Sequence, residues 1–329
     1  MRAMPANSVD AIVTDPPYFK VKGEAWDRQW DKPAQFLAWI GELCEQWQRV
    51  LKPNGSLYCF ASPQMATSVE VEITKRFNVL NRITWRKSST DEHNSGPWGR
   101  ASKEGLRAYF PQTEAIIFAE HYGADNIAKG EAGYAAKCDE LRGFVFEPLR
   151  TYLVAERDRA GFTTQMVDSE WQRQRGTKGQ MAGHWFGGTQ WALPTEANYI
   201  WLRGLLNESG GDYLSREYED LRREYEELRR PFSVTADVPY TDVWDFPTVQ
   251  AYPGKHPCEK PQALLRHIIQ ASSRPGAVVL DAFMGSGATG EAAKMLGRRF
   301  VGIEMSEDWL LKASRRIEGA REPDPGLFS

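Results

Sequence analysis

The sequence predicts an α/β fold whose sheet is divided along the chain by a mainly helical insertion. Short apolar segments alternate with amphipathic segments over residues 1–119 and again over residues 241–329. This alternation is typical of a sheet with helices packed on it. Residues 120–240 lack the alternation and are rich in Gly, Arg and Trp. We therefore expect three parts, with boundaries after residues 119 and 240.

The first part is predicted to contain four strands and two helices. The strand over residues 9–14 (VDAIVT) ends at Asp15-Pro16-Pro17, because proline cannot continue a central ladder. Residues 33–51 carry apolar side chains at helical spacing, and residues 52–55 (KPNG) favour a turn. The other predicted elements are a helix over 65–77 and strands over 56–61, 83–86 and 113–119.

The middle part is predicted to hold a pair of helices and a third, longer helix. The pair, over residues 148–159 and 164–174, flanks Gly161, which is the layout of a helix-turn-helix DNA reader. The third covers residues 214–230 and is too short for a free coiled coil. We expect its apolar stripe to pack against the protein's own body or against a second subunit in a homodimer. The stripe consists of Leu214, Tyr218, Leu221, Tyr225 and Leu228.

The last part is predicted to follow the order helix, strand, helix, strand, helix. These elements cover residues 261–272, 277–280, 288–296, 300–303 and 307–317. The first strand runs directly into residues 281–290 (DAFMGSGATG), which open the next helix. A glycine turn at this place lets a ligand approach the backbone at a helix N-terminus.

Glu304 ends the next strand, about twenty residues further on, where a carboxylate can accept both hydroxyls of a ribose. Taken alone, the string GSGATG also fits an NAD site, or a tight turn with Glu304 on the surface.

The string Asp15-Pro16-Pro17-Tyr18 also ends a buried strand, and its residue types suit chemistry on an amine attached to a base ring. Such an amine is a poor nucleophile, because its lone pair is delocalised into the ring. Asp15 supplies an acceptor for an N–H bond, Pro16 a carbonyl of fixed direction, and Tyr18 a face on which the base stacks. The base must first be flipped out of the duplex. The alternative is a stiff Pro-Pro turn with Tyr18 as packing.

The two motifs belong together if their strands are neighbours. In a doubly wound sheet, ligands bind outside the carboxyl ends of the strands. Asp15 and Gly285 both follow such ends, so donor and acceptor would then meet in one crevice.

Seven strings of the chain, in this order, resemble the amino-methylating DNA methyltransferases of the β group, including phage-associated members. The most specific are DPPY, HPCEKP and DAFMGSGAT. The seven strings cover residues 9–18, 51–58, 113–119, 243–246, 256–269, 279–293 and 300–309.

The resemblance implies a Rossmann-like sheet that binds S-adenosylmethionine (SAM), in a permuted order with the catalytic segment (1–119) before the SAM segment (241–329). Residues 120–240 would be the target-recognition insertion. The implied catalytic residues are Asp15, Pro16, Pro17 and Tyr18. The implied SAM-binding residues are Phe283, Gly285, Ser286, Gly287, Thr289 and Glu304, with Asp281, His256 and Lys260 at the methionine end. Only fourteen residues precede Asp15, fewer than is usual in this group.

The favoured substrate is adenine N6 in double-stranded DNA, because serine in place of Asp15 is the more usual mark of cytosine-N4 enzymes. A cytosine-N4 enzyme and a DNA-binding protein with an inactive methyltransferase domain are the alternatives. An NAD oxidoreductase would leave DPPY and HPCEKP unexplained. Protein-glutamine and RNA methyltransferases typically have asparagine at the first position and their SAM motif first.

The net charge of −3 does not by itself indicate a nucleic-acid partner, so a DNA-binding face must be local. The predicted contacts lie in two basic stretches and are Arg86, Lys87, Arg173, Arg175 and Lys178. The four cysteines lie far apart without a CxxC pair, so we expect no metal site. The sequence contains no membrane-length apolar run or signal peptide, and we expect the protein in the cytoplasm.

Overall fold

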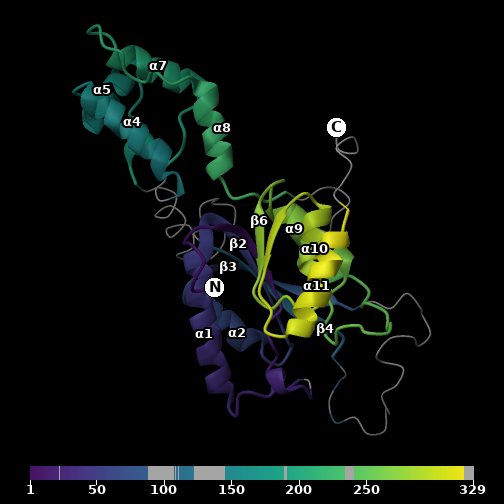
Figure 1. Ribbon diagram of the computed structural model, residues 1–329. Coiled ribbons are helices and arrows are strands. Elements are labelled where there is room, and N and C mark those ends of the chain that lie inside the picture. Colours follow the sequence, from purple (N-terminus) through teal and green to yellow (C-terminus); the bar gives the residue numbers. More distant parts are fainter. Residues whose placement is uncertain are drawn as a thin grey trace. The chain divides into compact units, whose positions relative to one another are not determined.

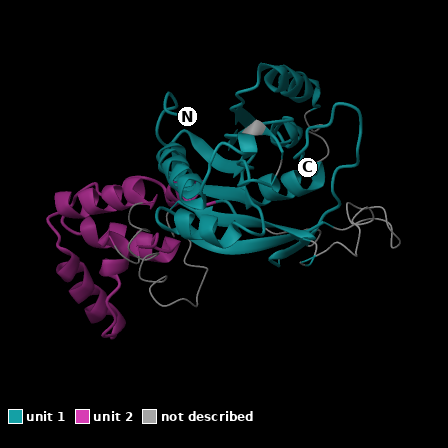
Figure 2. Ribbon diagram, turned by 90° about the horizontal axis from the view of Figure 1, so that it is seen from below, with its two compact units in different colours: residues 1–121, 231–329 teal, residues 122–230 magenta. Residues whose placement is uncertain are grey.

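The structure, a computed structural model, describes residues 1–21, 23–87, 107, 109, 111–121, 145–188, 191–233 and 241–321. The chain divides into two compact units (Figure 2). Unit 1 comprises residues 1–121 and 231–329, and unit 2 comprises residues 122–230.

In the described residues of unit 1, seven strands form one sheet with the order β5-β3-β4-β2-β1-β6-β7. At its centre β1 pairs in parallel with both β2 and β6, and β6 pairs in parallel with β7. On the other side β4 runs antiparallel to β2 and β3, and β5 pairs in parallel with β3. The strands are β1 (Val9–Thr14), β2 (Leu51–Ala61), β3 (Asn78–Arg86), β4 (Thr113–Glu120), β5 (Val243–Asp245), β6 (Val278–Asp281) and β7 (Arg299–Gly302).

Helices cover both faces of this sheet, because successive strand residues point to opposite sides (Figure 1). In β1, Ile12 packs with α1 (Pro33–Val50) and α2 (Ala66–Thr74). Its neighbour Val13 belongs to the opposite core, with α9 (Gln262–Ser272) and α10 (Ala288–Met295). The last helix, α11 (Glu307–Gly319), contacts α10. The predicted α/β fold is confirmed, and its helices lie on both faces of the sheet.

The sheet differs from the prediction in three places, the first being that β3 begins at Asn78 and not at residue 83. The predicted turn over residues 52–55 was wrong, because β2 runs without interruption from Leu51 to Ala61. Val9 pairs with Leu51 and Ala11 with Ser56, so the register between β1 and β2 shifts at this point. Residues 52–55 of β2 therefore have no regular partners in β1. Strand β5 was not predicted, since three residues carry too little periodicity.

The described part of unit 2 is helical, as expected. Between α4 and α5, Gly161 has a φ of 77°, which is unfavourable for other residues, and the Thr163 hydroxyl caps α5 by accepting from the Met166 N–H. The predicted helix, glycine turn, helix layout is therefore present. The helices are α4 (Glu147–Arg159), α5 (Thr164–Arg175), α6 (Ala182–Phe186), α7 (Glu196–Leu206) and α8 (Tyr218–Leu228).

The helix predicted over residues 214–230 is shorter than expected. Leu214 has a φ of 53°, outside the helical range, and its N–H donates to Glu156 Oε2 at 2.7 Å. Leu221 is fully buried in the core of unit 2, and Tyr225 stacks on Phe146 at 4.6 Å between ring centroids. The stripe is thus covered within its own unit and does not require a second subunit.

Among the described residues, no helix is both long and apolar enough to cross a membrane.

Candidate active site

The two predicted motifs lie at neighbouring strand ends. Strands β1 and β6 pair in parallel, with Ile12 opposite Leu280, so Asp15 and Asp281 emerge at the same edge of the sheet. The Thr14 hydroxyl donates a hydrogen bond to Asp281 Oδ1 at 3.1 Å, which joins the two strand ends directly. The condition for one shared crevice is therefore met.

A cavity of 740 Å³ opens at this edge and is lined by residues of both motifs. This volume lies within the usual range for small-molecule sites. Aromatic side chains form much of the wall, and the tilted pair Trp39 and Phe283 lies 5.5 Å apart between ring centroids. The predicted site residues in the lining are Asp15, Pro16, Pro17, Tyr18, His256, Lys260, Asp281, Phe283, Gly285, Ser286, Thr289 and Glu304.

The glycine loop is held by a hydrogen bond to Glu304 and packs closely against His256 and Ala313. The backbone N–H groups of Gly285 and Ser306 each donate to a different oxygen of Glu304, both at 2.9 Å. Gly285 has a φ of 50°, and a Cβ added there would lie 3.2 Å from the His256 ring. Gly287 has a φ of 76° and begins α10, and a Cβ there would lie 2.8 Å from that of Ala313. The bare backbone of this loop leaves room for a ligand, with a carboxylate held at the rim.

Asp281 is buried and fully engaged at the end of β6. Its Oδ1 also accepts from the Phe283 N–H at 3.0 Å, and its Oδ2 accepts from the Thr289 hydroxyl at 2.7 Å. Burial raises the pKa of Asp281 to about 6, although these hydrogen bonds oppose the rise.

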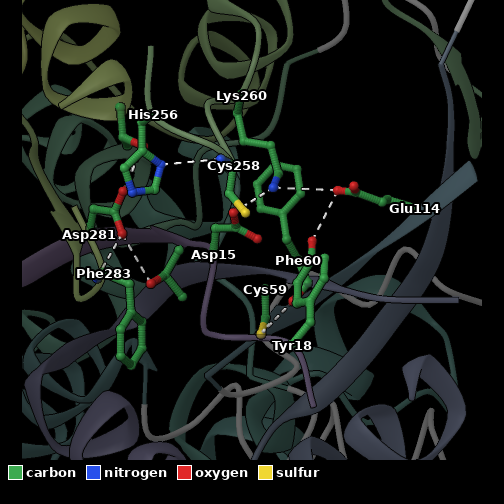
Figure 3. Close-up of polar contacts among 12 residues, drawn as sticks. Asp15, Tyr18, Cys59, Phe60, Glu114, His256, Cys258, Lys260, Asp281 and Phe283 are labelled. Carbon is green, nitrogen blue, oxygen red and sulfur yellow. Dashed lines mark hydrogen bonds and ion pairs between the residues drawn. The ribbon is translucent and has the colours of Figure 1, made fainter. Parts of the chain in front are cut away.

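Asp15 has one oxygen in an ion pair and one without a partner (Figure 3). The Lys260 ammonium lies 2.5 Å from Asp15 Oδ2, whereas the buried Oδ1 accepts no hydrogen bond from any described residue. Burial raises the pKa of Asp15, and Lys260 opposes this rise. The site thus presents a free carboxylate oxygen beside the cofactor loop.

Glu114, on β4, connects the catalytic string to two lysines. The Tyr18 hydroxyl donates to Glu114 Oε2 at 3.0 Å, and the Lys260 ammonium lies 3.4 Å from the same oxygen. Lys87 lies 2.5 Å from Glu114 Oε1. Burial opposes ionisation of Glu114, but Lys260 and Lys87 outweigh it and lower the pKa of this carboxyl. Burial, Asp15 and Glu114 together raise the pKa of Tyr18.

Comparison with known proteins identifies the family. A family model described as DNA methylase, covering N6 and N4 enzymes, matches residues 9–314. The chain belongs to this family. With it, the predicted enzyme class, a DNA methyltransferase that uses SAM, is confirmed, and the substrate is DNA.

Among the relatives, the DNA adenine methyltransferase YhdJ of Escherichia coli (strain K12) is 28% identical, over 97% of this chain and 80% of its own length. The type II methyltransferase M2.DpnII of Streptococcus pneumoniae is 26% identical, over 97% of this chain and 86% of its own. The solved structure of the cytosine-N4-specific PvuII DNA methyltransferase matches with a TM-score of 0.50 at 12% identity. That match covers 96% of this chain and 81% of the other, and it supports the fold.

The residues at the edge of the sheet fit SAM. The Gly285 backbone borders the cavity without a side chain, and the carboxylate of Glu304 keeps acceptor capacity beyond its two backbone partners. The role expected for Lys260 differs from its observed position. Its ammonium is bound to Asp15 and Glu114, so contact with the cofactor carboxylate stays a prediction.

Glu114 was not among the predicted site residues. The only signal was a carboxylate near the start of the apolar strand TEAIIFA. Lys87 and Arg86 are both engaged in this structure: Lys87 binds this carboxylate, and Arg86 pairs with the exposed Asp245. Their contact with DNA stays a prediction. Both contacts reduce the charge these residues offer to DNA.

The remaining predicted DNA contacts lie in unit 2, at the end of α5 and beyond it. Arg173 is exposed and pairs with Glu170, and the Arg175 guanidinium lies 4.2 Å from the ring centroid of Trp171. Lys178 is exposed in the segment after α5.

Proposed function

We propose that this protein transfers a methyl group from SAM to the N6 amine of adenine in double-stranded DNA. The observation that carries the proposal is the partnerless Oδ1 of Asp15, in the same cavity as the glycine loop and Glu304. An unpaired buried acceptor costs free energy, so it is expected where a ligand completes the hydrogen bond.

The described side chains suit activation of an amine. Asp15 Oδ1 accepts a hydrogen bond from an N–H of the target, and Lys260 on Oδ2 favours the ionised carboxylate against the effect of burial. Pro16 is buried in the cavity wall, and its carbonyl is the expected acceptor for the second N–H. Acceptors aimed at both bonds push electron density onto the nitrogen. When bound, SAM supplies the electrophilic methyl group on its sulfonium.

We also propose that the target adenine flips out of the duplex into the cavity. The Asp15 side chain is only 17% exposed, so a base that remains stacked in a duplex cannot reach it. Extrusion costs a few kcal/mol, and stacking on the Tyr18 ring, worth about 1–3 kcal/mol, offsets part of this cost.

Adenine is preferred to cytosine because aspartate occupies the first catalytic position and because YhdJ, a relative over 97% of the chain, is named an adenine methyltransferase. Incubation with mixed-sequence DNA and SAM, followed by mass spectrometry of the nucleosides, tests this choice. We expect N6-methyladenine. N4-methylcytosine would establish the alternative, and no methylated base would favour an inactive DNA-binding protein.

Target recognition is assigned to unit 2. Its helix pair has the layout of a DNA reader, and α5 exposes Gln165, Ser169 and Arg173 on one side. Residues near the N-terminus of a recognition helix contact base edges, and basic residues nearby bind phosphates.

The homodimer and the cytoplasmic location stay predictions. Since α8 covers its apolar stripe within unit 2, a dimer would have to use another surface. Light scattering at micromolar concentration tests this point, and a stable monomer would contradict the dimer.

A further inference from the structure

Glu114 is half-buried beside the site, and neither amine activation nor SAM binding as proposed above requires it. Its side chain is 12% exposed, and three residues contact its two oxygens. An unpaired buried carboxylate is strongly destabilising, whereas a paired one is retained only where its contacts compensate for desolvation. The contacts of Glu114 with Tyr18, Lys260 and Lys87 are therefore expected to serve the reaction.

Lys260 is shared between two carboxylates. Its ammonium lies 2.5 Å from Asp15 Oδ2 and 3.4 Å from Glu114 Oε2, and its side chain is 8% exposed. Two carboxylates and two ammoniums, those of Lys260 and Lys87, balance in this cluster. Without Glu114, Lys260 would have Asp15 as its sole carboxylate partner in the cluster and would be free to bridge both Asp15 oxygens.

Tyr18 is held from the same point. Its hydroxyl donates to Glu114 Oε2, and the Lys260 ammonium lies 5.4 Å from the centroid of its ring. One carboxylate oxygen thus fixes both the tyrosine and the lysine (Figure 3).

We propose that Glu114 is a positioning residue for methyl transfer. It draws Lys260 to the Oδ2 side of Asp15 and holds the Tyr18 ring by its hydroxyl, so Asp15 Oδ1 remains free for the target amine. This inference rests on the proposed function.

The test uses the full chain and Glu114→Gln, which keeps the shape and one acceptor oxygen but removes the charge. Glu45→Gln is the matched control, because it removes the carboxylate of an exposed ion pair with Arg76 on the surface of unit 1. The measurements are kcat for transfer of tritiated methyl groups to duplex DNA across pH, SAM affinity by calorimetry, and the melting temperature.

We expect Glu114→Gln to lower kcat by about 10- to 100-fold, the usual effect of losing a hydrogen bond to a charged group. SAM affinity should stay within about twofold, because Glu114 faces the base side of the site. The acidic limb of kcat should move to lower pH, because the negative charge of Glu114 raises the pKa of Asp15. The other titratable groups around this pair are unchanged in the variant. They are Tyr18, Cys59, Lys87, Cys258, Lys260 and Asp281.

A kcat within about twofold of wild type would overturn the inference. So would a loss of kcat with an unmoved acidic limb, which would indicate a purely structural role. If Glu114→Gln lowers the melting temperature, Tyr18→Phe becomes the deciding variant. It removes the hydrogen bond between the Tyr18 hydroxyl and Glu114 but keeps the carboxylate. Full activity in this variant would show that this hydrogen bond does not position Tyr18 for the reaction. If the wild type methylates no base, the proposed function is rejected together with this inference. If both the wild type and Glu114→Gln are active, only this inference is rejected.

Discussion

The Thr14 hydroxyl donates a hydrogen bond to Asp281 Oδ1 at 3.1 Å, although 267 positions separate the two residues. Thr14 ends the strand that leads to the catalytic string, and Asp281 ends the strand that leads to the glycine loop. This contact fixes the base side and the cofactor side of the cavity relative to each other within unit 1.

The raised pKa of Asp281 predicts that SAM binding depends on pH. Burial raises the pKa of Asp281 to about 6, so the carboxylate takes up a proton and loses its charge as the pH falls through this value. SAM carries positive charge, and its affinity should then fall by up to about tenfold per pH unit. Calorimetry from about pH 8 to pH 5 checks this. Thr14→Val should move the fall to higher pH, because it removes a hydrogen bond that lowers the pKa. Asp281→Asn should flatten the profile, and a flat wild-type profile would contradict the role of Asp281.

A second prediction separates the ring of Tyr18 from its hydroxyl. Tyr18→Phe keeps the stacking face but loses the bond to Glu114, so we expect a loss of kcat of about tenfold. Tyr18→Ala loses the ring as well and should cost at least about another tenfold. Single-turnover methylation of duplex DNA measures both. Equal rates in the two variants would show that the base does not stack on this ring.

A third prediction concerns the glycine loop. Gly287→Ala should reduce both stability and SAM affinity, because its φ is 76° and the new Cβ would lie 2.8 Å from that of Ala313. Gly297→Ala is the matched control. It has a similar φ of 69° but open space around it, so it should cost only about 1–2 kcal/mol of unfolding free energy and leave SAM binding intact. Chemical denaturation and calorimetry distinguish the two. Identical behaviour would mean that the close approach to α11 is unimportant.

A fourth prediction concerns unit 2. Arg173→Ala and Arg175→Ala should weaken DNA binding without changing SAM affinity, if α5 lies against DNA. Arg222→Ala is the control, since this exposed arginine of α8 pairs with Glu219 as Arg173 pairs with Glu170. Binding titrations at several salt concentrations decide whether a residue contacts phosphate, because loss of a phosphate contact also flattens the salt dependence. Unchanged DNA affinity in both variants would leave α4 and α5 a structural pair.

The fold and the two motifs could be predicted because each motif is local. Asp15 and Gly285 directly follow apolar strands, and the carboxyl ends of parallel strands share one edge. The start of α8 could not be predicted in this way. Leu214 fits the 4-3-4-3 spacing, but its N–H is bound by Glu156, far away in the sequence.

Glu114 and the position of Lys260 were missed for a related reason. Alternation along β4 predicts which face of the sheet each residue points to. It does not predict that β4 lies between β2 and β3, or which side chains meet at the edge of the sheet beside Asp15. The contacts of Glu114 follow from the antiparallel pairing of β4, and those of Lys260 follow from the position of the loop before α9. Both are long-range properties of the fold.

In the proposed reaction, the free oxygen of Asp15 activates the target amine. The most direct test of this role is single-turnover methylation of duplex DNA by Asp15→Ala and Asp15→Asn, with SAM affinity measured on the same samples. We predict that Asp15→Ala loses at least about 100- to 1,000-fold in rate, the scale for removing one preorganised group at a reacting centre, while SAM affinity changes little. Asp15→Asn, which retains an acceptor oxygen but no charge, should fall between Asp15→Ala and wild type. Substantial methylation of adenine by Asp15→Ala would show that Asp15 does not activate the amine.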